Sequence, residues 1–245
     1  MSSPIAVFTG VACIRSVLPH WALVGFLSLF PMLGQFWEAR WARQPARFER
    51  RLAFFAAAPV AFAALILAQT YGGVFQKGGQ GTLGWLPRSN DLTLDFYGWD
   101  QVARELKRRG LLDQPHSFLF TSSWYYSGQL AFATRGSATP VLCYHGWDAR
   151  SFAFWSRPGD WIGQDGILVA VNNHINEPQC YERWFTRIEP IGQFDVIRAG
   201  GPVRNIRLFR CARQLVAFPF DGSRTMDQIV QFARGEATEG PAPAR

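Results

Sequence analysis

The chain has 245 residues, enough for one ordinary domain or for a small domain joined to membrane helices. Apolar residues make up 48% of the chain, and charged residues make up 18%, below the roughly 25% usual in soluble domains. This composition excludes a disordered chain, a collagen, a coiled coil and a disulfide-rich miniprotein. The net charge is +7, but the basic residues form no Lys/Arg-rich stripe, so we expect no nucleic-acid partner.

Two uncharged stretches, 17–37 and 52–75, predict membrane-spanning helices. As helices they would measure about 31 Å and about 36 Å, enough to cross the hydrocarbon core of a bilayer. Trp21 stands near one end of the first stretch, and Tyr71 and Phe75 near the end of the second, where aromatic belts occur. The alternative is a pair of buried helices in a soluble core.

The segment between the two stretches, 38–51, contains five Arg, which predicts a cytoplasmic loop. We interpret it as a solvated turn facing the headgroups rather than as a specific lipid site. The chain after residue 75 is then extracytoplasmic, and the protein is a multi-pass protein of the inner membrane. Residues 4–14 are apolar but too short to span, so within the membrane region 1–76 they predict only a partial helix.

A glycine-rich linker is expected over 77–84, followed by a small extracytoplasmic α/β domain over 85–233 and a disordered tail over 234–245. The expected fold is thus two transmembrane α-helices followed by a domain with a mixed sheet and a C-terminal β-hairpin. The domain's predicted helices are 98–110, a helix capped by Ser122 or Ser123 and running to about 134, and 177–187. Its predicted strands are 117–121, 141–144, 166–171, and the hairpin strands 194–197 and 203–210.

Few residues of this domain have spacings that indicate chemistry. The four His and four Cys show no zinc-site spacing, so no metal or other cofactor is expected in this chain. Ser127-Gly128 lacks the G-x-S-x-G elbow of a hydrolase nucleophile. His145 and Asp148 could pair as a base and its orienting acid, although such residues more often satisfy backbone groups of a loop. Cys143, Cys180 and Cys211 are interpreted as small buried apolar residues.

A more informative cluster lies at the outer end of the first predicted span. Arg15 precedes the triplet Pro19-His20-Trp21, which offers a cation, a donor and an aromatic ring near the headgroups. Arg15 could hold a phosphate, His20 could donate to a phosphate or sugar oxygen, and Trp21 could stack on a sugar face. Alternatively, the triplet is an ordinary start of a helix at the membrane interface.

The stretch Val7–Gly34 resembles the late transmembrane region of bacterial dolichyl-phosphate-mannose protein mannosyltransferase-like enzymes, which include the aminoarabinose transferases of lipid A. Members show a Ser-Lys-Leu-Pro-His-aromatic segment that opens a membrane helix. The positions that fit it are Ser16, Leu18, Pro19, His20 and Trp21, whereas Val17 stands at the usual Lys position. The stretch Leu92–Lys107, the residues Tyr125, Gln129 and Phe132, the loop Trp147–Trp155 and the closing segment Phe194–Cys211 continue the likeness.

The resemblance implies an integral-membrane glycosyltransferase that moves a sugar from a polyprenyl-phosphate donor to an extracytoplasmic acceptor. It also implies that Arg15, His20 and Trp21 bind the donor. The family's catalytic carboxylates lie nearer the N-terminus, and this chain has no acidic residue before Glu38. The chain is therefore expected to be the C-terminal half of such an enzyme, to be inactive alone and to need its N-terminal half as partner. A divalent metal in the complete enzyme is left open.

A second interpretation from another class also stays open. The chain could be a non-enzymatic two-span membrane protein that presents an extracytoplasmic binding or assembly domain. Both interpretations share membrane lipid as a partner and the same topology, so the topology is the feature that can be tested first.

The predicted topology can be measured by scanning single cysteines through a variant without native Cys. Cysteines placed in 85–235 should react with a membrane-impermeant thiol reagent in intact spheroplasts, because that domain is expected outside. Cysteines at 44–48 should stay unlabelled until the membrane is opened. Labelling of 44–48 in intact spheroplasts would contradict the orientation that the Arg-rich segment predicts.

Overall fold

The computed structural model of the chain describes residues 30–145, 148–155, 158–171 and 178–218. The chain divides into two compact units between Leu65 and Ile66, so the last turns of the long helix belong to the second unit. The partial helix 4–14, most of the first predicted span and the tail 234–245 lie outside the described residues.

The described part of the first unit, from Phe30, is helical. Helix α3 runs over Phe30–Arg43 and helix α4 over Pro45–Gly72, with Gln44 between them. The sequence predicted a loop over the Arg-rich segment 38–51. The structure instead has two helix ends there, which meet at Gln44. Arg, Ala and Glu favour helices, and proline is well suited to the first position of α4, which explains the difference.

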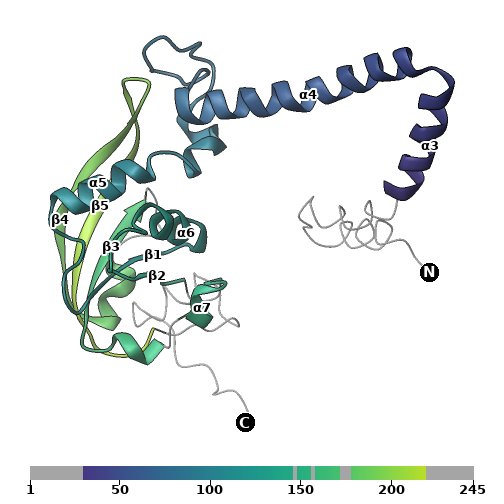
Figure 1. The fold of residues 1–245 in the computed structure, drawn as a ribbon. Coiled ribbons are helices and arrows are strands. Elements are labelled where there is room, and N and C mark those ends of the chain that lie inside the picture. The colour runs from purple at the N-terminus through teal and green to yellow at the C-terminus, as the bar shows by residue number, and fades with distance from the viewer. Residues whose placement is uncertain (1–29, 146–147, 156–157, 172–177, 219–245) are drawn as a thin grey trace, which may run out of the picture. The chain divides into compact units, whose positions relative to one another are not determined.

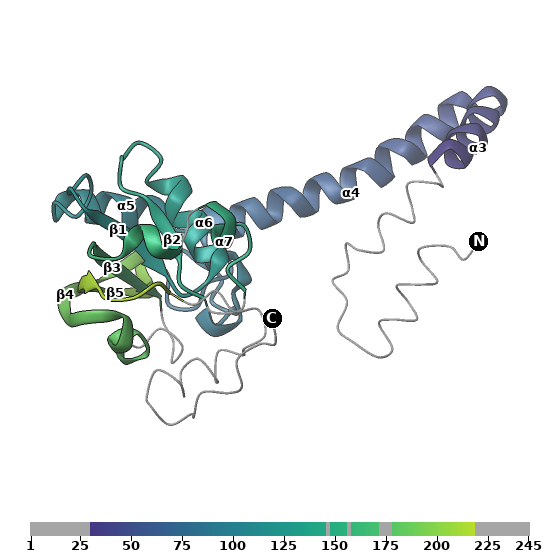
Figure 2. The same ribbon diagram turned by 90° about the horizontal axis from the view of Figure 1, so that it is seen from below.

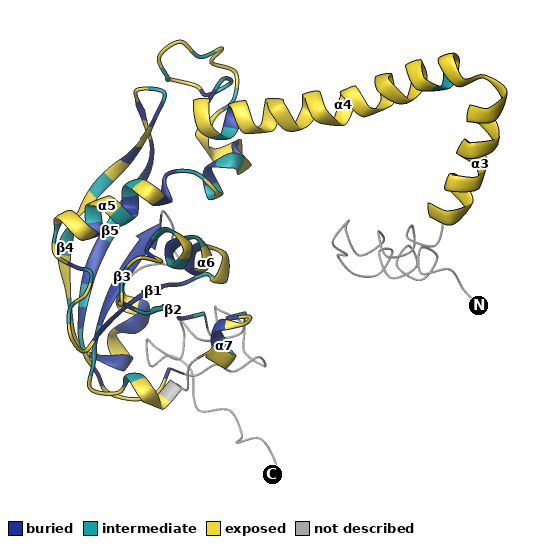
Figure 3. Cartoon of the chain, viewed as in Figure 1, coloured by how far each residue is buried: buried dark blue, intermediate teal, exposed yellow. Residues whose placement is uncertain are grey.

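Within the described residues, α4 is the one helix that is long and apolar enough to cross a membrane. It contains most of the predicted span 52–75 but begins earlier, at Pro45, and ends at Gly72. Nearly all residues of α4 are exposed, as Figure 3 shows by colour, which is the pattern expected of a helix that faces lipid. Of the first predicted span, only Phe30–Trp37 is described, as the beginning of α3.

The second unit is a five-stranded mixed sheet with helices (Figure 1). Its strands are β1 (Ser117–Thr121), β2 (Val141–Cys143), β3 (Asp165–Val171), β4 (Phe185–Arg198) and β5 (Gly201–Gln214), in the order β2-β1-β3-β5-β4. β1 pairs in parallel with β2 and β3, whereas β5 is antiparallel to β3 and β4. Its longer helices are α5 (Trp99–Arg108) and α6 (Trp124–Ala133); the short helices are α7 (Phe152–Trp155), η2 (Arg88–Asn90), η3 (Leu92–Asp95), η4 (Pro158–Trp161) and η6 (Pro178–Trp184). The mixed sheet with a C-terminal hairpin was predicted and is confirmed.

Each face of the sheet carries its own hydrophobic core. Helices α5 and α6 lie along one face (Figures 1 and 2), and their buried residues, among them Val102, Leu106 and Leu130, pack against β1, β3 and β5. The opposite face is aromatic: Phe118 and Phe120 of β1 pack with Tyr181 and other residues of η6. β1 and β3 are thus buried on both faces, as parallel strands usually are.

The hairpin is longer than the sequence suggested. β4 and β5 have 14 residues each, and β4 begins at Phe185, where the sequence predicted the end of a helix over 177–187. The helical part of that segment is the 3₁₀-helix η6. β4 is an edge strand, which can hold Pro190 because a proline N–H is not needed on the free side.

A buried ion pair ties the end of α4 to this hairpin. The guanidinium of Arg198, the last residue of β4, donates to the carboxylate of Asp91, and both side chains are almost fully buried. Arg198 also donates to Gln76 Oε1 at 2.8 Å, and Gln69 Nε2 of α4 donates to Asp91 Oδ2 at 2.7 Å. Because a buried charge is tolerated only when paired and hydrogen-bonded, these contacts hold three segments in one arrangement.

Gly73 lets the chain turn beside this pair. Its φ of +63° is in the left-handed region, and a Cβ there would lie 2.9 Å from Arg198 Nε. The segment 77–84, predicted to be a flexible linker, also contacts the hairpin, because Gln80 N–H donates to the Ala199 carbonyl at 2.7 Å. Within the same turn, Thr82 Oγ1 donates to the Gln76 carbonyl at 2.6 Å.

Asp91→Ala tests the contribution of the buried pair. It should lower the free energy of unfolding of the full chain in detergent by about 3–5 kcal/mol, because it leaves the Arg198 charge buried without a counter-ion. Asp100→Ala is the matched control, because it breaks the ion pair between Asp100 and Arg104, which are 65% and 69% exposed. It should lower the free energy of unfolding by less than about 1 kcal/mol. Equal losses in urea unfolding would contradict the assignment.

The same pair predicts a dependence on pH. Burial alone would raise the pKa of Asp91, but hydrogen bonds from Thr93 and Arg198 outweigh it and hold that pKa below its ordinary value. A carboxyl whose folded pKa is lowered stabilises the fold above its unfolded pKa and loses this contribution as the pH falls through the folded pKa. The Asp91→Ala variant should therefore lose less stability than the wild type when the pH is lowered below about 4.

Candidate functional site

The carboxyl ends of β1 and β2 are the part of the second unit where an open α/β sheet usually binds ligands. α6 follows β1 directly, and α7 lies in the connection that follows β2. A cavity of about 560 Å³ lies between the first turns of α6, α7 and the end of η3. We call it the aromatic basin; it is lined by Asp95, Phe96, Trp124, Tyr125, Gly128, Gln129, Arg150, Ser151, Phe152 and Trp155.

Large aromatic rings dominate the basin and remain open to solvent. Phe96 is 68% exposed and Trp155 72% exposed, and Trp124 and Tyr125 are also exposed. Trp155 packs edge-on against Phe152 with ring centroids 4.9 Å apart, so its position is supported from one side. Exposed aromatic rings gathered in one cavity suit a ligand with flat apolar faces, such as a sugar ring or a prenyl chain.

Asp95 is the acidic residue that lines this basin within the described part of the chain. Its Oδ1 is 3.7 Å from Arg204 Nη2 and accepts a hydrogen bond from Tyr126 Oη at 3.4 Å. No hydrogen bond or ion pair with another described residue is found for Oδ2, and the side chain is 44% exposed. One carboxylate oxygen is therefore held by the protein, while the other can accept a hydrogen bond from a ligand hydroxyl.

The two partners of Asp95 are themselves fixed by burial. The Arg204 guanidinium lies 5.6 Å from the Trp99 ring and 5.7 Å from the Tyr126 ring, and it donates to the Leu94 carbonyl. Burial raises the pKa of Tyr126, so its hydroxyl stays protonated at neutral pH and can donate. These contacts orient Asp95 before any ligand arrives.

Arg150 supplies a cation on the other wall of the basin. Its guanidinium lies over the Trp124 ring at 4.9 Å and its Nε donates to Asp148 Oδ1 at 2.6 Å. His145 accepts a hydrogen bond at Nδ1 from the Asp148 backbone N–H, at 2.9 Å, and burial lowers its pKa. This contact uses the backbone of Asp148, as the interpretation of a satisfied loop expects.

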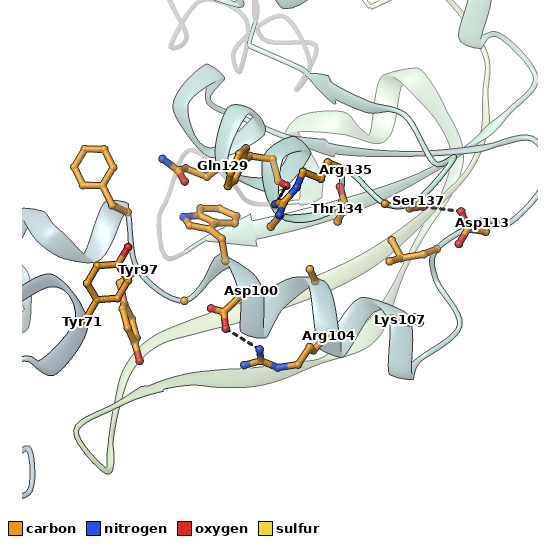
Figure 4. A pocket seen from close by; sticks show the side chains of 18 residues that line it. Tyr71, Tyr97, Asp100, Arg104, Lys107, Asp113, Gln129, Thr134, Arg135 and Ser137 are labelled. Atoms are coloured by element: carbon orange, nitrogen blue, oxygen red, sulfur yellow. Dashed lines mark hydrogen bonds and ion pairs between the residues drawn. The ribbon is translucent and has the colours of Figure 1, made fainter. Parts of the chain in front are cut away.

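A second cavity, of about 940 Å³, lies between α5 and α6 and is shown in Figure 4. We call it the α5–α6 groove. Asp100 and Arg104 pair across one turn of α5 at 2.7 Å, and Asp113 accepts a hydrogen bond from Ser137 Oγ at 2.8 Å. Its other labelled side chains include Tyr71, Tyr97, Lys107, Gln129 and Arg135.

The groove and the basin are neighbours that share lining residues. Phe96 and Gln129 line both cavities. Tyr71, in the last turn of α4, lines the groove and stands beside Tyr97 in Figure 4. A path of lining side chains thus runs within the second unit from the end of the apolar helix to the aromatic basin.

α5 takes part in this surface because its first residues are held close to the hairpin. Gly98 precedes the helix with φ of +85°, and a Cβ there would lie 2.2 Å from Val196 Cγ1. Trp99, Val102 and Leu106 form the buried face of the helix, whereas Ala103 lines the groove.

Other reactive groups of the second unit are structural. Ser127 Oγ donates to the Leu142 carbonyl at 2.8 Å and is fully buried. Cys143, Cys180 and Cys211 are buried. Burial raises the pKa of Cys143 and of Cys211 to about 12, so both remain unreactive thiols at neutral pH. Among the described residues, no three His, Cys, Asp or Glu side chains gather closely enough to hold a metal ion.

The predicted donor-binding residues Arg15, His20 and Trp21 lie outside the described residues, so their role stays a prediction. No motif or spacing in the sequence selects Asp95, Trp124 or Arg150. One feature of the sequence does point to this site: the aromatic-rich segments 92–99 and 124–132 each contain the first residue of a helix.

Comparison with known proteins adds no relative, since no protein-family model, curated protein or solved structure matches this chain.

Proposed function

We propose that this chain works as the sugar-recognising part of an integral-membrane glycosyltransferase that uses a polyprenyl-phosphate sugar and acts on an extracytoplasmic acceptor. The observation that carries the proposal is the aromatic basin with Asp95. Phe96 and Gln129 line both this basin and the α5–α6 groove, which Tyr71 also lines. The family resemblance of Val7–Gly34 and Leu92–Lys107 agrees with it.

The geometry suits a sugar carried by a membrane lipid. A polyprenyl chain stays in the hydrocarbon layer, while its phosphate and sugar extend into the interfacial zone, where α4 would leave the bilayer. Tyr71 stands at that end of α4, and the groove leads from it to the basin. In the basin, Trp155 or Trp124 can stack on a sugar face, and Asp95 Oδ2 can accept from a sugar hydroxyl.

We infer a binding role rather than a catalytic one from the acidic residues that line the basin. Among the described residues that line the basin, Asp95 stands without a second carboxylate, and its negative charge is already balanced by Arg204. General acid–base chemistry on a sugar hydroxyl would then need a group other than these described lining residues. The same observation favours the alternative of a non-enzymatic two-span protein whose extracytoplasmic domain binds carbohydrate.

The proposal can be tested with the full chain in neutral detergent, titrated with a short-chain polyprenyl-phosphate hexose. Trp155→Ala should raise the dissociation constant about tenfold, because it removes a stacking ring from the basin. Trp85→Ala is the matched control: Trp85 is similarly exposed, at 69%, but it packs on Phe75 and does not line the basin. Its dissociation constant should stay within about twofold of the wild type.

Two further measurements separate the outcomes. The same polyprenyl phosphate without its sugar should bind Trp155→Ala and wild type alike, because the missing ring faces the sugar. Mixing the chain with donor and acceptor in the absence of other proteins should give no transfer. Equal binding of the sugar-bearing lipid by Trp155→Ala, Trp85→Ala and wild type would contradict sugar recognition by the basin.

A further inference from the structure

The first unit contains a cavity that the proposed function does not use. It has a volume of about 470 Å³ and lies where α3 and α4 meet. Four of its lining residues are Arg and four are aromatic, and no Asp or Glu lines it within the described part of the chain. We call it the arginine corner; its arginines are Arg40, Arg43, Arg47 and Arg51.

The four guanidiniums converge because the helices turn at Gln44. Arg40 and Arg43 lie in the last turn of α3, and Arg47 and Arg51 are one turn apart near the start of α4. For none of the four is an ion pair with another described residue found, and all four are exposed. Four like charges in one cavity repel one another unless an anion joins them.

Aromatic rings give the corner a defined shape. The Trp41 and Phe48 rings stack with centroids 6.4 Å apart, and Trp37 meets Phe48 edge-on at the same distance. Phe48 is therefore the half-buried contact that holds α3 against α4. Trp37 and Phe48 line the cavity together with the arginines, so the site offers both charge and apolar surface.

We propose that the arginine corner binds the phosphate of an anionic membrane lipid, which replaces the interpretation of 38–51 as a merely solvated turn because four of its arginines line one cavity. Guanidinium groups recognise phosphate oxygens bidentately, and the exposed apolar helix that continues from the corner would place it at the headgroup level of the bilayer. The aromatic rings would lie against the glycerol and the first acyl carbons, as interfacial Trp and Phe do. This anchor differs from the aromatic basin in both location and ligand.

Native mass spectrometry of the full chain in neutral detergent tests the site, with phosphatidylglycerol as probe and phosphatidylcholine as the zwitterionic comparison. Wild type should retain phosphatidylglycerol in preference to phosphatidylcholine. Arg47→Gln should lower the affinity for phosphatidylglycerol about tenfold, because it removes charge-assisted hydrogen bonds to the phosphate. Arg47→Lys, which keeps the charge but not the bidentate geometry, should recover only part of the affinity.

Arg50→Gln is the matched control, since Arg50 has the same charge and lies three residues away but does not line the cavity. Its affinity should remain within about twofold of the wild type. Equal losses for Arg47→Gln and Arg50→Gln would show unspecific attraction by net charge and overturn the proposal. Displacement of the lipid by an equal concentration of inorganic phosphate would also overturn it, because the site would then serve a free anion.

Discussion

The ion pair between Arg198 and Asp91 is the constraint on which the rest of the second unit depends. Two opposite charges without access to water are stable only when their remaining hydrogen-bonding positions are filled, and here Gln69, Gln76 and Thr93 fill them. These partners come from α4, from the turn after it and from the short helix before α5. The end of the apolar helix is thereby fixed to the tip of the β4–β5 hairpin.

The position of the candidate site follows from that attachment. Asp91 begins the segment that contains Asp95 and Phe96, so holding Asp91 also holds the wall shared by the groove and the basin. Arg204, six residues beyond Arg198 on the same hairpin, then reaches Asp95. The β4–β5 hairpin thus supplies both Arg198, which pairs with Asp91 in the buried ion pair, and Arg204, which orients the carboxylate of Asp95.

The sequence predicted those parts of the fold that depend on local pattern. Uncharged length predicted the apolar helix of the second span, and apolar runs predicted β1 and β3. It failed where tertiary contacts override pattern: Pro190 and Gly192 interrupt β4 in sequence, yet pairing with β5 carries the strand through them. Asp95 could not be chosen from the sequence because its importance comes from Arg204 and Tyr126, 109 and 31 residues away.

The most direct test of the central claim is a double-mutant cycle on Asp91 and Arg198, with the free energy of unfolding of the full chain measured in detergent for both single Ala variants and the double variant. The double variant should be less destabilised than the sum of the two single variants by at least about 2 kcal/mol, because each single change leaves a buried charge unpaired and the double change removes both charges. Losses that add within about 0.5 kcal/mol would contradict it, since the two side chains would then act independently.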